Sequence, residues 1–594
     1  MKVTIPKNQI PKQVNIGEGY GDLISSWNLD LTSNPGKTRV SPRLLVNTSS
    51  DNTSTMVYPV AFVRNTSNTM AIDTYFAVCQ QAIFTNSNSN LIGGGTFTTD
   101  PLASSPTTAL SNLYSDAVTF DGDLVVSLKT TAARLTAGVW SASWYTTLSG
   151  SPTLTNGVAH PLCVGFNNLL LIGNGNYIAT VTTGGTVSTT RIILPTEYEV
   201  IWIRSSNTTY WIGTRHKFGG IGKVFGWDGK SENFTQDYKV GSDIVFAGVI
   251  KDEIPYIVNG NGQLLGFNGG GFSEIARFPI ADDKINQLDE GLTTYPINVN
   301  RNGMALINNN IHIFLNAGIN TTKYTFIENM LSGIWEYTPE TGLYHKYGIS
   351  KNNDSNINDF GSPKLIQAGA LMALNSIQKL LAGAQLYKAD GSTTTTEIGV
   401  INYVGGDAKA KMAYYVTPKI YTQEADEMWQ KVFLIYEKLK NTGDFITMKY
   451  RTSKNFRSSF DQAATWASTT TFTTTATEFS GVSVGDEVEI LSGEGSGLSA
   501  NITAISGSGT YTVTIDTTVT GASGTFQFRI NNWTKISSIT DLVMTYQDFS
   551  VGIPSNWIQY KVIMYGTGSA TAENANSPEI EKLISLSTPQ VKAI

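Results

Sequence analysis

The stretch Gly222-Lys-Val-Phe-Gly-Trp-Asp-Gly-Lys (222–230) recurs, class for class, as Gly262-Gln-Leu-Leu-Gly-Phe-Asn-Gly-Gly (262–270), at an offset of 40 residues. In each copy a glycine opens a short apolar run, and an aromatic residue precedes Asp-Gly or Asn-Gly. These dipeptides favour the positive φ angles of a type I′ turn, so each copy predicts a strand, a tight turn and a second strand. A repeat at this spacing predicts a chain built from copies of one small unit.

Weaker copies of the same hairpin flank these two, at 176–185, 333–342 and 384–391. A more apolar pair of predicted strands precedes the hairpins, at 163–173, 200–213, 244–260 and 304–316, and similar units open at 117–128 and 58–84. Each unit is therefore predicted to hold four strands, at intervals of roughly 40–60 residues, which is the spacing of blades in a β-propeller. Residues 57–405 predict six or seven blades, and a β-helix or stacked sandwiches is the alternative.

The pattern changes after about residue 411. Four alternating segments predict paired strands, at 429–439, 444–451, 557–566 and 579–586. They predict an antiparallel β-sandwich over 406–462 and 534–594, interrupted by an insertion. The insertion, 463–533, has four or five short strands between glycine turns and predicts a small β-barrel, with the Thr-rich tract 469–475 as its tether. The predicted fold class is thus all-β: a propeller, then a sandwich that carries an inserted barrel.

The first 56 residues lack this periodicity. Prolines at Pro6, Pro11, Pro35 and Pro42 space isolated apolar residues. Such spacing favours an extended arm that packs on another part of the protein. The apolar side chains of Val-Ser-Pro-Arg-Leu-Leu-Val (40–46) support the arm, and a disordered terminus is the alternative.

Composition excludes several classes of protein. A hydrophobic fraction of 41% with only 15% charged residues argues against disorder. The formal net charge of −6 is too small, and of the wrong sign, for a general nucleic-acid-binding protein. The first residues contain no apolar segment typical of a secretory signal, which predicts synthesis and assembly in a cytoplasm. Cys79 and Cys163 are predicted to be two buried thiols, with one bridge as the alternative.

Candidate catalytic motifs are weak. Gly493-Glu-Gly-Ser-Gly-Leu-Ser resembles a phosphate-binding loop, but it lacks the Gly-Lys-Ser/Thr ending and lies between predicted strands, so a hairpin loop is favoured. Trp227-Asp228 is assigned to the Asp-Gly turn and not to a WD repeat.

Histidines and carboxylates give no metal pattern either. His160, His216, His312 and His345 share no ligand spacing, which predicts surface or hydrogen-bonded core imidazoles. Three acidic clusters are predicted to be solvated turns: Asp252-Glu253, Asp282-Asp283 and Glu424-Asp426-Glu427. We predict no catalytic, cofactor-binding or metal-binding residue, no cofactor and no enzymatic activity. A carboxylate pair for glycoside cleavage, assembled from distant loops, is left open.

The arm Ser33-Asn-Pro-Gly-Lys-Thr-Arg-Val-Ser-Pro-Arg, the propeller units and the final segment Ser577-Pro-Glu-Ile-Glu-Lys-Leu-Ile form a pattern that resembles virion proteins of tailed bacteriophages. The resemblance is to the propeller-bearing nozzle, or muzzle, proteins of short-tailed phages. It covers most of the chain, is architectural, and carries over no functional residue.

The resemblance implies a structural component of a phage tail. Several copies, commonly six, would form a ring below the portal and adaptor, as part of the DNA-ejection conduit and as a platform for other tail or fibre proteins. The modest negative charge fits a conduit along which DNA slides without sequence-specific binding. The alternative is a receptor- or glycan-binding tail propeller, with polysaccharide depolymerase activity as its enzymatic form. The expected location is the virion tail, after assembly in the host cytoplasm, with host-surface contact possible in either case.

Overall fold

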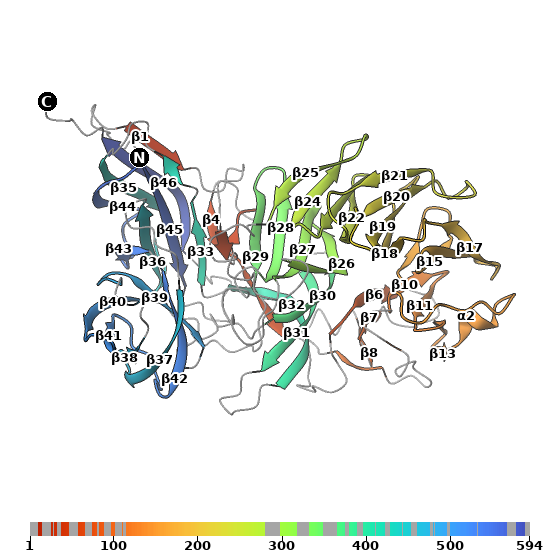
Figure 1. Cartoon of the computed structure of the whole chain (residues 1–594), viewed down its shortest axis with the longest axis horizontal. Helices are drawn as coiled ribbons and strands as arrows, with labels where there is room; N and C mark the ends of the chain where they lie inside the picture. Colours follow the sequence, from red (N-terminus) through yellow and green to blue (C-terminus); the bar gives the residue numbers. More distant parts are fainter. Residues whose placement is uncertain are drawn as a thin grey trace.

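The computed structural model shows an all-β protein (Figure 1). It describes residues 10–14, 25–27, 29–32, 37–46, 58–65, 74–79, 82–87, 97–100, 110, 115–278, 297–317, 332–348, 365–374, 379–388, 396–409, 412–417, 419–421, 428–441, 443–452, 460–475, 479, 482–492, 494–495, 499–531, 533–566 and 578–588. Within these ranges the single helix is α2 (Trp144–Thr147). No helix in the described ranges has the length and apolar character needed to span a bilayer.

The described residues of the propeller form seven four-stranded antiparallel sheets, which are its blades. The strands, blade by blade, are β6 (Ala61–Asn65), β7 (Thr74–Val78), β8 (Ile83–Ser87), β9 (Thr98–Thr99); β10 (Ala117–Phe120), β11 (Asp123–Ser127), β12 (Ala132–Thr136), β13 (Val139–Ser141); β14 (Leu162–Val164), β15 (Leu170–Asn174), β16 (Tyr177–Val181), β17 (Val187–Ile193); β18 (Tyr198–Ser205), β19 (Tyr210–His216), β20 (Lys223–Trp227), β21 (Gln236–Lys239); β22 (Val245–Lys251), β23 (Ile254–Asn259), β24 (Gln263–Phe267), β25 (Phe272–Arg277); β26 (Ile297–Ile307), β27 (Asn310–Ala317), β28 (Gly333–Thr338), β29 (Gly342–Tyr347); and β30 (Leu365–Leu374), β31 (Lys379–Lys388), β32 (Thr396–Lys409), β5 (Pro42–Val46).

The blades close into a ring through their first strands. Each first strand contacts the first strand of the next blade, and β30 contacts β6, so the seventh blade meets the first. Separate buried apolar clusters fill the spaces between neighbouring blades. Small sheets are stabilised this way because each buries its faces against two neighbours. The expected all-β fold with a propeller is confirmed, and the blade number is the larger of the two expected.

The outer strand of the seventh blade comes from the N-terminal arm. β5 pairs antiparallel with β32, with Leu44 opposite Val404. The Leu44 side chain is 2% exposed and belongs to the apolar cluster between the sixth and seventh blades. The arm therefore helps to close the ring, which follows from the apolar residues of segment 40–46.

The two strongest sequence repeats lie on the third strands of adjacent blades, β20 and β24. Their turns differ from the expected type I′, because only the glycines, Gly229 and Gly269, have positive φ. Asp228 Oδ1 instead accepts the backbone N–H groups of residues 230 and 231, at 2.9 and 2.8 Å. Asn268 Oδ1 likewise accepts those of residues 270 and 271. The side chain replaces a backbone acceptor, which is why Asp and Asn serve equally well here.

The weak copy predicted at 384–391 does not share this position. Its described part lies on β31, the second strand of its blade, whereas the other hairpin copies lie on third strands. An apolar run that ends near Asp-Gly is therefore not specific to one strand of a blade. Residues 389–391 of this copy are outside the described residues.

The sandwich consists of two sheets around one core. Its strands are β1 (Ile10–Val14), β2 (Ser25–Trp27), β3 (Leu29–Asp30), β4 (Thr38–Val40), β33 (Met412–Val416), β34 (Ile420–Tyr421), β35 (Met428–Tyr436), β36 (Phe445–Thr452), β43 (Thr534–Ile539), β44 (Tyr546–Pro554), β45 (Trp557–Tyr565) and β46 (Glu579–Thr588). One sheet has the order β3-β4-β46-β35-β44 with β1 on β46, and the other has β2-β33-β45-β36-β43 with β34 on β45. Arm strands therefore enter both sheets. Trp429 and Tyr415, both 0% exposed, lie in the shared core.

The inserted module is a closed barrel of the order β37-β38-β41-β40-β39-β42. Its strands are β37 (Phe460–Ser468), β38 (Thr471–Thr474), β39 (Glu487–Ser492), β40 (Ser499–Ser506), β41 (Tyr511–Ile515) and β42 (Thr525–Asn531). The expectation that the Thr-rich tract 469–475 is a tether is wrong, because β38 lies inside it. Phe472 and Thr474 point inward while their neighbours are half-buried, so alternate residues of the tract fill the barrel core.

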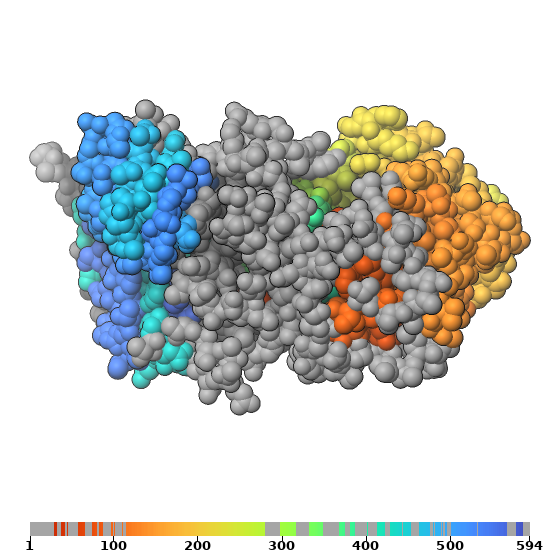
Figure 2. Space-filling view, turned by 90° about the horizontal axis from the view of Figure 1, so that it is seen from below, coloured from red at the N-terminus to blue at the C-terminus, as the bar shows by residue number. Residues whose placement is uncertain are grey.

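The sandwich and barrel lie at one end of the molecule and the second and third blades at the other (Figure 2). Contacts of β29 with β2 and β3 join the sixth blade to the sandwich. Most of the phosphate-loop-like stretch at 493–499 lies outside the described residues. The strands on either side of it, β39 and β40, pair antiparallel, as expected for a hairpin.

Candidate functional site

The four histidines are held by local partners, and two of them, His312 and His345, lie in the sixth blade. The ring nitrogens of His160 lie 3.0 Å from the carbonyl of Gly173 and 3.2 Å from that of Lys129, and burial lowers the pKa of His160. Burial lowers the pKa of His312 to about 4 and that of His345 to about 3. His216 accepts the backbone N–H of residue 220 at Nδ1, over 2.9 Å. In the part of the chain that the structure describes, no three His, Cys, Asp or Glu residues form a group that could hold a metal.

Cys79 and Cys163 are separate buried thiols, as expected. Burial raises the pKa of Cys163 to about 12, which keeps it protonated and unreactive at neutral pH.

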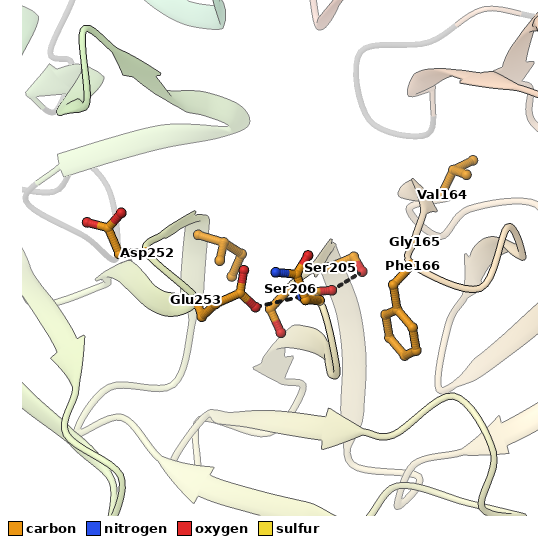
Figure 3. A pocket seen from close by; sticks show the side chains of 9 residues that line it. Val164, Gly165, Phe166, Ser205, Ser206, Asp252 and Glu253 are labelled. Carbon is orange, nitrogen blue, oxygen red and sulfur yellow. Dashed lines mark hydrogen bonds between the residues drawn. The ribbon is translucent and has the colours of Figure 1, made fainter.

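Of the three acidic clusters, the structure places one, Asp252-Glu253, at a surface groove. The other two, 282–283 and 424–427, lie outside the described residues. The groove has a volume of about 350 Å³ and lies where β14, β18 and β22, the first strands of three successive blades, end. Its lining is Val164, Gly165, Phe166, Ser205, Ser206, Asn207, Ile250, Asp252 and Glu253. Phe166 lies on one side and the two carboxylates on the other, with the serines between them (Figure 3).

The acidic side of the groove is fixed by a tight turn between β22 and β23. Asp252 and Glu253 have φ angles of 50° and 66°, in the left-handed region that non-glycine residues seldom adopt. Glu253 Oε2 accepts the backbone N–H of Asn207 over 2.7 Å, which joins the turns of adjacent blades. The sequence predicted a solvated turn here, and its position beside another blade required the structure.

The aromatic side is the end of a row of stacked rings. The Phe166 ring lies 5.0 Å from Tyr210, centroid to centroid, and Tyr210 stacks on Trp227 at 5.4 Å. A Cβ on Gly165 would lie 2.2 Å from the Tyr210 ring, so only glycine lets the loop approach this closely. The Tyr210 hydroxyl donates to Asn167 Oδ1, which fixes the same loop.

The hydroxyls of the groove are engaged with the backbone. Ser205 Oγ donates to the carbonyl of Ser206 over 2.8 Å, and Ser206 Oγ donates to that of Thr209 over 3.1 Å. A nucleophilic serine requires a base within hydrogen-bond reach, and these two hydroxyls are directed to carbonyl oxygens instead. The arrangement suits binding better than nucleophilic catalysis.

A second polar constellation lies among the first strands of the propeller, centred on Arg204 of β18. Its Nε donates to the carbonyl of Gly248 in the fifth blade over 3.0 Å. Its Nη2 donates to the carbonyl of Arg301, at 2.7 Å, and to Oδ1 of Asn302, at 2.9 Å, in the sixth blade. Both residues belong to an irregular stretch of β26, between the paired residues Val299 and Met304.

Asn302 extends this network to the first three blades. Its Nδ2 donates to the carbonyl of Val60, at 2.9 Å, and to Oδ1 of Asp116, at 2.7 Å. Asp116 Oδ2 accepts the backbone N–H of Leu162 over 3.0 Å. The network joins the inner strands of six blades and is a structural clamp, which sequence reasoning missed because its members are far apart in the chain.

The junction between propeller and arm buries a charged cluster around Glu336, which is 1% exposed. Lys346 Nζ donates to Glu336 Oε2 over 2.7 Å, and the Tyr344 hydroxyl donates to the same oxygen. Thr32 of the arm donates to it over 3.3 Å, and Asn310 donates to Oε1 over 2.8 Å. Burial favours the protonated carboxyl, but Lys346 and the other partners bring the pKa of Glu336 below its ordinary value.

A similar buried charged cluster joins the barrel to the sandwich. Lys449 of β36 donates to Glu487 of β39 over 2.6 Å, and the Lys561 ammonium lies 3.9 Å from the same carboxylate oxygen. Burial lowers the pKa of Lys449, the Glu487 carboxylate opposes that shift and the Lys561 charge adds to it. Buried ion pairs of this kind fix relative orientation more than they add stability.

Comparisons with known proteins show no family for this chain. No protein-family model matches the chain, and no curated protein matches it. Among solved structures, an extracellular domain of a hybrid two-component system from B. thetaiotaomicron is 10% identical, with a TM-score of 0.38 over 73% of this chain and 45% of that one. The chain thus spans under half of that structure's length.

Two further structures are similar at the same level. The β-propeller domain of Cps50 (Swd1) from Myceliophteria thermophila is 9% identical, with a TM-score of 0.37 over 61% of this chain and all of that one. The computationally designed Ika8 protein is 10% identical, with a TM-score of 0.32 over 63% of this chain and 96% of that one. Similarities at this level indicate neither an activity nor a partner for this chain.

Proposed function

We propose that this protein is a structural subunit of a bacteriophage tail, of the nozzle or hub type, that assembles into a cyclic ring. In this role it forms part of the DNA-ejection conduit and a platform for the portal, adaptor and fibre proteins. The role is structural rather than catalytic, and its location is the virion tail.

The observation that carries the proposal is the way one arm ties the modules together. Arm strands pair in both sandwich sheets and in the last blade, and the buried cluster at Glu336 includes Thr32 of the same arm. A ring that transmits DNA under pressure needs subunits whose modules do not move apart. A chain locked in this way fits such a subunit better than a set of independent binding domains.

An exposed apolar turn offers a contact surface for a neighbouring copy. Leu542, Val543 and Met544 lie between β43 and β44, and Val543 is 73% exposed. β43 and β44 stand last in the strand orders of the two sandwich sheets, so each presents an edge in the described structure. Edge strands with apolar residues beside them favour association between chains.

Native mass spectrometry and electron microscopy of the purified full chain test the ring. We expect particles of cyclic symmetry, six copies being the expected number, with contacts above about 1,000 Å². Val543→Asp is expected to shift the population to the 64.3 kDa monomer. Val139→Asp, at a site 68% exposed on the second blade, is the matched control and is expected to leave the ring intact.

Two results would overturn the proposal. One is that the protein remains a monomer at every concentration used for tail assembly, even when portal and adaptor proteins are present. The other is a particle in which antibodies to this chain label no part of the tail.

A further inference from the structure

The groove between the third, fourth and fifth blades presents one face of an aromatic ring to solvent. Phe166 is 39% exposed, although one side of its ring lies against Tyr210. Burying the remaining apolar area would be favourable for any ligand with a flat apolar face. The C–H face of a pyranose ring is such a surface, and its hydroxyls lie around the rim.

Polar groups that match a hydroxyl rim stand across the groove. The Asn207 amide has two donors and an acceptor, and the Asp252 and Glu253 carboxylates accept. Neither the Asp252 carboxylate nor the Asn207 side chain makes a hydrogen bond to any residue that the structure describes, and Glu253 uses one oxygen for the backbone of Asn207. Hydrogen bonds from ligand hydroxyls to these carboxylates would be of the stronger, charge-assisted kind.

The groove is also formed before any ligand arrives. The left-handed turn at Asp252-Glu253 is braced by Asn207, and the Phe166 loop is held by Tyr210 through a ring contact and through Asn167. A binding site whose groups are already fixed loses less conformational entropy on binding. The volume of about 350 Å³ lies at the lower end of the range of ligand sites, about 300–1,000 Å³.

The charge of the groove lining determines which class of saccharide it favours. The lining contains two carboxylates and no Lys or Arg among its nine residues. An acidic sugar or a phosphate would be placed beside like charges, which disfavours its binding. Neutral hydroxyls meet no such penalty, and an ammonium group would be attracted.

We propose that this groove binds a hexose unit of a neutral or amino-bearing polysaccharide, with Phe166 as the stacking surface and Asn207, Asp252 and Glu253 as its hydrogen-bonding partners. The site goes beyond the ring proposal and does not depend on it. Its proposed role is binding, and the two serine hydroxyls, which are directed to backbone carbonyls, are not placed as nucleophiles.

Saturation-transfer NMR and calorimetry on the full chain test the site, with maltotetraose and chitotetraose as neutral probes, a chitosan tetramer as the amino probe and tetragalacturonic acid as the acidic probe. We expect dissociation constants of about 1 mM or tighter for at least one neutral or amino probe, and binding at least about tenfold weaker for the acidic one.

Three variants localise the effect. Phe166→Ala is expected to weaken binding at least about tenfold, and Asn207→Ala, at an exposed side chain, is expected to weaken it without affecting folding. Asp252→Asn keeps a residue that tolerates the left-handed turn, and it is expected to weaken the amino probe more than the neutral ones. Phe218→Ala, at an aromatic residue 79% exposed after β19, is the control and is expected to change nothing.

Several outcomes would overturn the proposal. They are failure of every neutral and amino probe to bind, tighter binding of the acidic probe, and equal losses in the Phe166 and Phe218 variants. None of these bears on ring assembly, which is measured without saccharide. A failed ring in turn leaves the saccharide titration unaffected.

Discussion

Lys346 donates to Glu336 over 2.7 Å at the place where the sixth blade meets the N-terminal arm, and both side chains are buried. Tyr344, next in this cluster, also belongs to the apolar core of the sandwich. One edge of the sixth blade therefore contributes side chains both to the buried charged cluster and to the core of the sandwich. Burying charge is costly unless each group is paired, so the cluster favours one arrangement of propeller and arm over others.

Glu336→Gln is expected to lower the free energy of unfolding by about 3–5 kcal/mol, because it removes the carboxylate to which the buried Lys346 ammonium donates. Urea unfolding followed by tryptophan fluorescence measures the change. Glu274→Gln, which breaks an exposed pair with Arg277, is the control and is expected to cost under about 1 kcal/mol. Equal effects of the two substitutions would show that the buried cluster does not hold the junction.

Gly248→Ala is expected to destabilise the contact between the fourth and fifth blades. Trp202, 0% exposed, donates from Nε1 to the carbonyl of Val245 over 3.2 Å, and a Cβ on residue 248 would lie 2.6 Å from its ring. Overpacking of this kind costs about 1–3 kcal/mol, measured as a lower thermal midpoint. Gly271→Ala, where a Cβ meets nothing within 4 Å, is the control. A Gly248 variant as stable as this control would contradict the close packing of the indole.

Leu44→Ala is expected to weaken the contact between the sixth and seventh blades of the propeller. Removing the buried side chain leaves a cavity between the sixth and seventh blades, at a cost of about 2–5 kcal/mol. Hydrogen exchange should accelerate in β5 and in β32, its pairing partner, more than in the second blade. Unchanged exchange in these two strands would mean that the arm strand does not hold the seventh blade.

The all-β fold could be predicted because its main signals are local. Third strands in neighbouring blades repeat an apolar run before Asp-Gly or Asn-Gly, and the 40-residue offset between 222–230 and 262–270 is a blade length. The turn type was wrong because Asp228 and Asn268 act through their side chains rather than through positive φ. Backbone angles of that kind are not encoded in the dipeptide alone.

Features that depend on distant segments could not be predicted. The pairing of Leu44 with Val404 joins the beginning of the chain to the end of the propeller, and no periodicity records it. The groove was missed for the same reason, since Phe166, Asn207 and Asp252 come from three blades. The sequence does contain one local signal at the groove. Asp-Glu occupies a tight turn, where Asn-Gly or Asp-Gly is the common choice.

Acid is expected to destabilise the sixth blade. His312 and His345 are neutral in the folded protein, with pKa values of about 4 and about 3, whereas an exposed histidine in the unfolded chain titrates near 6.5. The unfolded state therefore binds more protons below pH 6.5, and stability falls as the pH falls toward these folded values. Between pH 7 and pH 5 each histidine contributes a loss of about 2 kcal/mol.

Thermal unfolding at pH 7 and at pH 5 measures this dependence. His345→Gln is expected to lose stability at both pH values but to show a smaller difference between them, because one of the two buried imidazoles of the sixth blade no longer titrates. Leu44→Ala, which removes packing and no titratable group, is expected to keep the full difference of the unsubstituted protein. A His345 variant with an unreduced difference would show that this imidazole is not a source of the acid sensitivity. Glu336 does not account for a difference between pH 7 and pH 5, because its lowered pKa makes acid destabilising only below its ordinary value near 4.5.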